Sequence, residues 1–349
     1  MAPASSFDKL RMRATSNRLM LSLSTCLREA PAFARPASAG RKAASLRRRQ
    51  EHEGYPRVWS ARASTGKIGA MTGLAVRLPP LPDFSPGHVW LVGAGPGDPG
   101  LLSLLALHAL NEADVVVYDA LVSADILALA GPKAAREYAG KRGGKPSPKQ
   151  RDISERLIEL ARQGLKVLRL KGGDPCLFGR GAEEALALAA AKVPFRFVPG
   201  ITAGLGGLAA AGIPMTHREV NSAVTFFTGH DAGGDLPDSI DWTALVNGAP
   251  VLVLYMGLAH LARISAKLIE AGLDAKTPAA LVSKATMDEQ QVIETTLGSA
   301  AAAADSARLE PPCLIVIGDV VPLRAALDPN ASIEARAAAA QAILGRSHR

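Results

Sequence analysis

The sequence predicts an α/β fold with two α/β lobes: an N-terminal lobe built on a mainly parallel sheet, a C-terminal lobe built on a mixed sheet, and a cleft between them. Short apolar runs such as Val89–Val92 alternate with segments of helical periodicity, which is typical of βαβ units around a buried parallel sheet. The length of 349 residues suits two domains better than one core. A stretch rich in Gly, Ala and Pro, 199–220, separates two such sets of segments.

The N-terminal lobe, 88–198, is expected to alternate strands with helices. Its continuous apolar runs predict strands at Val89–Val92, Asp114–Tyr118, Lys166–Leu170 and Phe195–Val198. Its helical patterns cover Leu101–Glu112, 152–163 and Gly181–Ala191. The preceding residues, 78–87, are rich in Pro and are not expected to form a helix.

The connector 199–220 leads to the C-terminal lobe, 221–325. There the same reasoning predicts strands at Ala223–Thr228, Pro250–Tyr255, Ala279–Val282 and Cys313–Ile317, with a helix over 258–271. The tail, 326–349, is Ala-rich and predicts a terminal helix over 331–344 without visible chemistry.

The basic character of the chain belongs to its first residues. The whole chain has 40 Lys and Arg against 32 Asp and Glu, but residues 1–70 alone hold 14 against 4, so the remainder holds 26 against 28. A slightly acidic body argues against nucleic-acid binding. Residues 1–87 form a basic leader without a folded pattern. It is interpreted as a transit peptide, a disordered tail or, the interpretation we favour, an untranslated segment upstream of a start at Met71.

Composition excludes several further classes of protein. The three cysteines are more than 100 positions apart, which excludes a disulfide framework and fits a reducing, cytoplasmic location. The seven histidines have no metal-ligand spacing, so no metal is expected. No apolar stretch reaches the roughly 18–20 residues of a membrane span, so we expect neither a membrane nor a nucleic acid as partner.

Two glycine-rich turns follow predicted strands of the N-terminal lobe. The first, 93–98, starts like a dinucleotide-binding fingerprint but has Asp98 at the third glycine position, and Pro96 and Pro99 remove backbone donors. A phosphate site is therefore disfavoured. The second turn, 171–175, contains two glycines that permit close backbone approach, and its Asp174 is interpreted either as a ligand acceptor or as a cap of the turn. Both turns are expected at the carboxyl edge of the sheet, where ligands bind.

Several charged residues surround these turns. Asp119 closes a predicted strand, where its carboxylate is expected to face the crevice. Lys141 and Arg142 belong to a cationic stretch with two glycines, and Arg180 and Arg218 each stand beside a turn. These cations are interpreted either as a solvated surface or as a site for a ligand with several carboxylates.

Nine short motifs in order resemble the tetrapyrrole methylase superfamily, and within it the enzymes that methylate uroporphyrinogen III. They include Val-Gly-Ala-Gly-Pro-Gly-Asp-Pro at 92–99, Gly-Lys-Arg at 140–142, Arg-Leu-Lys-Gly-Gly-Asp-Pro at 169–175, Val-Pro-Gly-Ile-Thr-Ala at 198–203 and Tyr-Met-Gly at 255–257. The resemblance covers about 88–325. It implies a homodimeric enzyme that binds S-adenosylmethionine in the cleft between its lobes.

The resemblance also assigns residues and a reaction. It implies transfer of methyl groups to C2 and C7 of uroporphyrinogen III, giving precorrin-2 for sirohaem and cobalamin biosynthesis. Asp119 matches the family's proton acceptor, and Lys141 matches its proton donor, with the alternative that Lys141 binds a substrate carboxylate. Arg142, Arg180 and Arg218 are expected to bind substrate carboxylates. The residues expected to bind the donor are Pro96, Gly172, Gly173, Asp174, Leu177, Thr202, Ala203, Met256 and Ala285.

Some positions depart from the family pattern. Ala285 stands where a glycine is frequent, so its methyl group is expected to narrow the donor pocket. Residues 1–87 are too irregular to predict an additional folded lobe, so we expect a monofunctional methyltransferase. The alternatives are a later precorrin C-methyltransferase, which would share the donor site, and a non-catalytic α/β binding protein.

Overall fold

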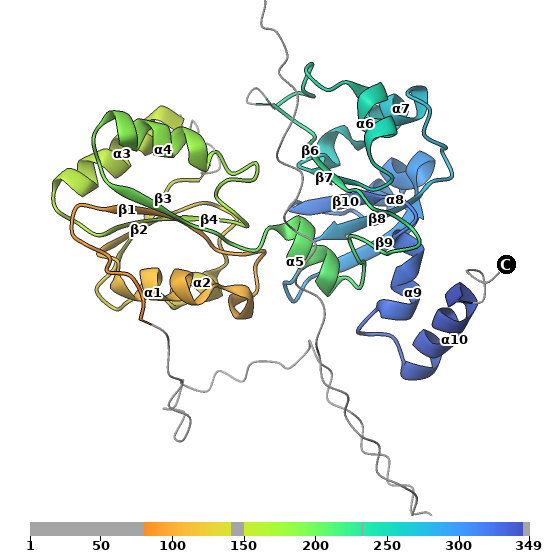
Figure 1. The fold of residues 1–349 in the computed structure, drawn as a ribbon, viewed down its shortest axis with the longest axis horizontal. Coiled ribbons are helices and arrows are strands. Elements are labelled where there is room, and N and C mark those ends of the chain that lie inside the picture. The colour runs from red at the N-terminus through yellow and green to blue at the C-terminus, as the bar shows by residue number, and fades with distance from the viewer. Residues whose placement is uncertain (1–79, 141–149, 232–233, 345–349) are drawn as a thin grey trace, which may run out of the picture. The chain divides into compact units, whose positions relative to one another are not determined.

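A computed structural model describes residues 80–140, 150–231 and 234–344 (Figure 1). The first sheet has the strand order β3-β2-β4-β1-β5, and all its neighbouring strands run parallel. Its strands are β1 Val89–Gly93, β2 Val115–Tyr118, β3 Ala135–Tyr138, β4 Val167–Lys171 and β5 Phe195–Val198. The predicted parallel sheet is confirmed, and because all strands share one direction, their carboxyl ends lie at one edge.

Helices cover both faces of this sheet (Figure 1). One face packs against α1 Leu104–Glu112, which follows the short 3-10 helix Pro99–Leu101, and against α2 Ala124–Ala128. The other face packs against α3 Gln150–Arg162 and α4 Gly181–Ala190. Ser103 and Ser123 begin α1 and α2 by accepting hydrogen bonds from backbone N–H groups of the first helical turn.

The second sheet is mixed, as predicted. Its strand order is β6-β7-β10-β8-β9, with β6 and β7 parallel and the other neighbours antiparallel. Its strands are β6 Thr225–Thr228, β7 Leu252–Tyr255, β8 Pro278–Ser283, β9 Gln291–Thr296 and β10 Cys313–Ile317.

Helices also pack on both faces of the second sheet. The apolar sides of α7 Leu261–Glu270 and α8 Ala300–Ser306 bury one face, and α5 Ala203–Ala210 packs on the other through Leu208. The remaining helical elements are α6 Trp242–Gly248, α9 Arg324–Leu327, α10 Ile333–Leu344 and the 3-10 helices Leu258–His260, Leu297–Ser299 and Val321–Leu323. The predicted terminal helix is confirmed as α10. Among the described residues, no helix is long and apolar enough to cross a membrane.

The structure changes one predicted boundary. Residues 80–87 contain no helix, as predicted, but they belong to the first lobe rather than to the leader. Phe84 is buried and stacks on Trp90, with ring centroids 4.5 Å apart. The Pro82 carbonyl lies 3.1 Å from His108 Nε2. A Pro-rich segment without periodicity is therefore held in place by one aromatic anchor, which pattern reading does not detect.

Two strands were not predicted. β3 and β9 are the edge strands of their sheets, and neither is a continuous apolar run. The connector, 199–220, contains α5. Residues 1–79, including the proposed start at Met71, lie outside the described part of the chain.

Candidate active site

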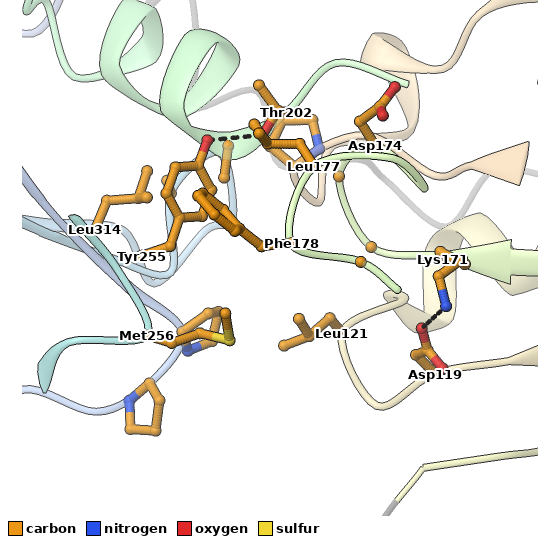
Figure 2. A pocket seen from close by; sticks show the side chains of 18 of the residues that line it. Asp119, Leu121, Lys171, Asp174, Leu177, Phe178, Thr202, Tyr255, Met256 and Leu314 are labelled. Carbon is orange, nitrogen blue, oxygen red and sulfur yellow. Dashed lines mark hydrogen bonds and ion pairs between the residues drawn. The ribbon is translucent and has the colours of Figure 1, made fainter. Parts of the chain in front are cut away.

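A cavity of about 680 Å³ opens at the carboxyl ends of the first sheet's strands and is closed by residues of the second lobe (Figure 2). Its walls come from the loops after β1, β2 and β4, from the start of α5, and from residues after β7, β8 and before β10. All residues predicted to bind the donor line it: Pro96, Gly172, Gly173, Asp174, Leu177, Thr202, Ala203, Met256 and Ala285.

The two glycine turns are joined to each other by backbone hydrogen bonds. Gly95 N donates to Gly173 O at 3.1 Å, and Gly173 N donates to Gly95 O at 2.7 Å. Both residues have positive φ, +74° and +67°, a region that favours glycine. A Cβ on Gly93 would lie 2.5 Å from Gly173 O. The turns therefore form one compact wall, and their glycines present backbone rather than side chains to the cavity.

Asp174 links this wall to neighbouring backbone through two hydrogen bonds. Its Oδ1 accepts from Cys176 N at 2.8 Å, and its Oδ2 accepts from Gly200 N at 3.0 Å. Both carboxylate oxygens thus already have backbone donors. Of the two interpretations left open by the sequence, capping of the turn is the one this geometry supports, although Asp174 also lines the cavity.

Asp119 lies at the cavity wall next to two buried cations. Arg169 Nη2 is 2.5 Å from Asp119 Oδ1. Lys171, whose ion pair with Asp119 is drawn in Figure 2, has its Nζ 3.6 Å from Asp119 Oδ2. The side chain of Asp119 is 27% exposed, whereas those of Arg169 and Lys171 are at most 3% exposed. Asp119 therefore faces the cavity as predicted, but with two partners that sequence reasoning missed.

A third missed residue completes this cluster. Glu184, on the first turn of α4, is fully buried, and its Oε1 accepts from Arg169 Nε at 3.1 Å and from Lys171 Nζ at 3.1 Å. Gln150 Nε2 donates to the same oxygen at 2.8 Å. A signal for the two cations was present in the strand alternation, because residues 167, 169 and 171 share one face of β4, but this alternation does not indicate Glu184.

The predicted substrate cations are placed unequally. Arg180 lines the cavity, with positive φ of 59°, and its Nε lies 3.2 Å from Glu183 Oε1. Arg218 is exposed and is not part of the cavity wall. Lys141 and Arg142 lie outside the described residues. The structure thus brings Arg180 to Asp119's cavity but not Arg218.

Tyr255 connects the second sheet to the donor residues. Its hydroxyl accepts from Gly204 N at 2.7 Å and lies 2.7 Å from Thr202 Oγ1 (Figure 2). Burial raises the pKa of Tyr255 above its usual value, so the phenol stays protonated. Phe178 packs against the same ring at a centroid distance of 5.1 Å. Tyr255 belongs to the motif Tyr-Met-Gly at 255–257, but its hydrogen bonding to the start of α5 was not predicted.

Ala285 lines the cavity, and its methyl group packs against α5. It is buried, and a Cβ placed on Gly207 of α5 would lie only 2.7 Å from the Ala285 methyl group. Helix α5 can therefore pack here only because residue 207 has no side chain. The methyl group of Ala285 and the missing one at Gly207 complement each other.

Cys313 is a further wall residue from the second lobe. Burial raises the pKa of its thiol to about 12.

The described residues contain no group of three or more His, Cys, Asp or Glu side chains that would hold a metal ion.

The family model for "Tetrapyrrole (Corrin/Porphyrin) Methylases" matches residues 88–301. The chain belongs to this family. It is 59% identical to a uroporphyrinogen-III C-methyltransferase of Sinorhizobium sp over 266 residues, which are 76% of this chain and 95% of the relative. It is 50% identical to a siroheme synthase of Sodalis glossinidius over 68% of this chain, and it spans about half the length of that relative.

Solved structures of the family agree with the fold. The chain resembles a uroporphyrin-III C-methyl transferase from Thermus thermophilus complexed with S-adenyl homocysteine, at 39% identity and a TM-score of 0.59. The match covers 67% of this chain and 98% of that one. A cobalt precorrin-4 methyltransferase is similar at 26% identity and a TM-score of 0.61, covering 69% and 98%. The predicted family and fold class are confirmed.

Proposed function

We propose that this chain uses S-adenosylmethionine to methylate uroporphyrinogen III at C2 and C7, giving precorrin-2. The observation that carries the proposal is that the predicted donor residues converge on one cavity with Asp119 in its wall. The high identity to the Sinorhizobium enzyme supports the same acceptor. Precorrin-2 would supply sirohaem and cobalamin biosynthesis.

The cavity fits the donor in size and chemistry. Its glycine turns present backbone groups, and a Cβ on Gly172 would lie 2.7 Å from Leu121 Cβ, so this wall has no room for a side chain. When bound, the donor supplies an electrophilic methyl group on a positively charged sulfonium. The wall residues from the second lobe are mainly apolar, which suits the body of such a ligand.

Asp119 is the proposed proton acceptor. A pyrrole carbon that gains a methyl group makes the macrocycle positively charged, and a proton must leave to restore conjugation. The Asp119 carboxylate, partly exposed to the cavity, stabilises that charge and collects that proton. Lys141 is the proposed proton donor on the strength of the resemblance alone.

The substrate's carboxylates require cations. Arg180 stands in the cavity wall and is the best placed of those described; Arg142 and Arg218 are proposed as additional contacts from the resemblance. Arginine suits this role because its guanidinium binds carboxylates through two parallel hydrogen bonds. No metal is needed for the reaction, since the donor carries the methyl group.

We also propose a cytoplasmic homodimer. β5 is an edge strand of the first sheet, and its Phe195 and Phe197 are each 37% exposed with their rings 5.8 Å apart. Exposed aromatic side chains on an edge strand are typical of surfaces that another chain covers. Light scattering tests this proposal: Phe195→Ser/Phe197→Ser is expected to lower the measured mass to one chain, and an unchanged dimer would exclude this face.

The test of the reaction uses the purified full chain, S-adenosylmethionine and uroporphyrinogen III without oxygen, with product mass as the readout. A gain of two methyl groups is expected. The alternative, a later precorrin C-methyltransferase, shares the fold of the cobalt precorrin-4 enzyme and predicts donor binding without methylation of uroporphyrinogen III. Failure to bind S-adenosylhomocysteine would contradict both and leave the non-catalytic binding protein.

A further inference from the structure

Three ionisable side chains are buried beneath Asp119. Arg169, Lys171 and Glu184 are 1%, 3% and 0% exposed. β4, which carries the two cations, lies inside a parallel sheet with helices on both faces, where strands are normally continuous apolar runs. Its other residues follow that rule. Burial of three ionisable groups at this point is therefore a costly departure that needs a reason.

Strand register places the cluster under the cavity edge. Val117 of β2 pairs with Arg169 of β4, so Asp119, two residues further, comes level with Lys171. Val115, Val117 and Val167 belong to the core beneath α3 and α4. By the two-residue alternation of strands, the charged residues continue that same face. The packing that buries the valines thus also brings four charges together.

Within the cluster, Glu184 and Asp119 share the same two cations. Arg169 contacts Glu184 through Nε and Asp119 through Nη2, and Lys171 Nζ lies 3.1 Å from Glu184 and 3.6 Å from Asp119. Glu184 Oε1 receives a third donor, Gln150, while Oε2 is buried without a hydrogen-bond partner among the described residues. Both ion pairs of Glu184 are thus formed with the same two cations that contact Asp119.

Charge balance gives this arrangement a function. The two cations are matched by two carboxylates, so Asp119 competes with Glu184 for them. Without Glu184, both cations would contact Asp119 alone, and the buried cluster would keep one positive charge without a partner carboxylate. Buried ion pairs add little stability compared with apolar residues of similar volume, so stability alone does not explain the cluster.

We propose that Glu184 is a positioning residue for Asp119: by sharing Arg169 and Lys171, it orients the Asp119 carboxylate and keeps it able to accept a proton. The inference rests on the proposed function of Asp119. It predicts that loss of the Glu184 charge impairs turnover. It also predicts that removing the Lys171 charge from the same chain restores equal numbers of positive and negative charges in the cluster, and with them part of the turnover.

The experiment compares the full chain with Glu184→Gln, with Lys171→Met/Glu184→Gln, and with Glu155→Gln as the matched control. Glu155 forms an exposed pair with Arg151 on α3, at 2.7 Å. Glu184→Gln is expected to lower kcat about 30-fold, less than the roughly 100-fold or more of a complete acid–base contribution because Asp119 itself remains, with KM and the Kd for S-adenosylhomocysteine unchanged. Its Tm should fall by about 5–10 °C because a buried cation loses its partner.

The double variant decides the cause. It should recover at least half of the lost Tm and regain kcat about tenfold over Glu184→Gln, most of the roughly 30-fold loss and again less than a complete acid–base contribution. A double variant as slow and as unstable as Glu184→Gln, or one that does not fold, overturns the proposal; so does a Glu184→Gln variant as active as Glu155→Gln. If the unsubstituted chain binds S-adenosylhomocysteine but does not methylate uroporphyrinogen III, the proposed function fails, and the order of Tm values still tests the charge balance.

Discussion

The two sides of the cavity differ in chemistry. The first lobe supplies charged side chains to the wall: Asp119, Arg169, Lys171, Asp174 and Arg180. Among the described residues of the second lobe, no Asp, Glu, Lys or Arg lines the cavity. Its contribution is mainly apolar and aromatic, as with Tyr255, Met256 and Leu314. The charges thus stand at the strand ends of the parallel sheet.

The difference follows from how the two sheets are built. A parallel sheet gathers all its carboxyl ends at one edge, so adjacent strands deliver several charges to one place. Arg169 and Lys171 are fixed there by strand register and complete burial. The second lobe instead positions α5 at the cavity, through the close packing of Ala285 against Gly207 and the hydrogen bond from Gly204 N to the hydroxyl of Tyr255. Substitutions on the two sides should therefore affect different steps.

The largest effect is expected from Asp119→Asn, which removes the charge that faces the cavity. Turnover should fall about 100-fold or more, the size of a lost acid–base contribution, while calorimetry should still detect S-adenosylhomocysteine binding. Asp125→Asn, an exposed residue of α2, is the matched control and should keep full turnover. Unchanged turnover in Asp119→Asn would remove Asp119 from the mechanism.

Gly200→Ala should disrupt the cavity wall formed by the two glycine turns. A Cβ there would overlap the Gly173 carbonyl oxygen and the Gly93 backbone, which cannot move without separating the glycine turns. The expected cost is about 3 kcal/mol of unfolding free energy, as for overpacked sites, with loss of donor binding. Gly248→Ala is the control, because a Cβ at Gly248 meets nothing within 4 Å. Equal Tm values for the two variants would mean that this close approach does not constrain the turns.

Tyr255→Phe should act on donor binding rather than on chemistry. It leaves the buried Gly204 N–H without its acceptor, at a cost of about 1–3 kcal/mol, and releases Thr202. We expect the Kd for S-adenosylhomocysteine to rise about tenfold, with a much smaller change in kcat. Tyr118→Phe is the control, since the Tyr118 hydroxyl has no hydrogen bond to a described residue. An unchanged Kd in Tyr255→Phe would show that the second lobe does not hold Thr202 in place.

The sequence predicts the strands of the N-terminal lobe better than the side-chain contacts of its site. Apolar runs located β1, β2 and β4, because strands buried on both faces leave a continuous signal. β5 was also located, from its two phenylalanines and Val198, although it is an edge strand. β3, with the sequence Ala-Arg-Glu-Tyr, is an edge strand and leaves none. The glycine turns predicted the wall because their positions require residues without side chains.

The buried charges could not be identified in the same way. Lys171 was assigned to a turn, although it is the last, buried residue of β4. Recognition of its partner Glu184 requires the pairing of two distant segments, the end of a strand and the first turn of a helix. Composition and periodicity describe each segment separately, so contacts across segments appear only in the folded chain.

The smallest effect concerns Cys313, which should behave as an apolar wall residue rather than as a nucleophile. Burial raises the pKa of its thiol from about 9 to about 12, so at pH 8 only about one thiol in ten thousand is ionised. Because folding raises the pKa of this thiol, the Cys313 thiol lowers the free energy of unfolding only as the pH rises above about 9, where the thiol of an unfolded chain would ionise. Iodoacetamide at pH 8 should therefore leave Cys313 unmodified in the native chain while it labels the exposed Cys176. Peptide mass spectrometry measures both sites, with a denatured sample as the control. Equal labelling of the two cysteines in the native chain would mean that solvent reaches the second lobe's side of the cavity, and that its apolar character does not exclude water.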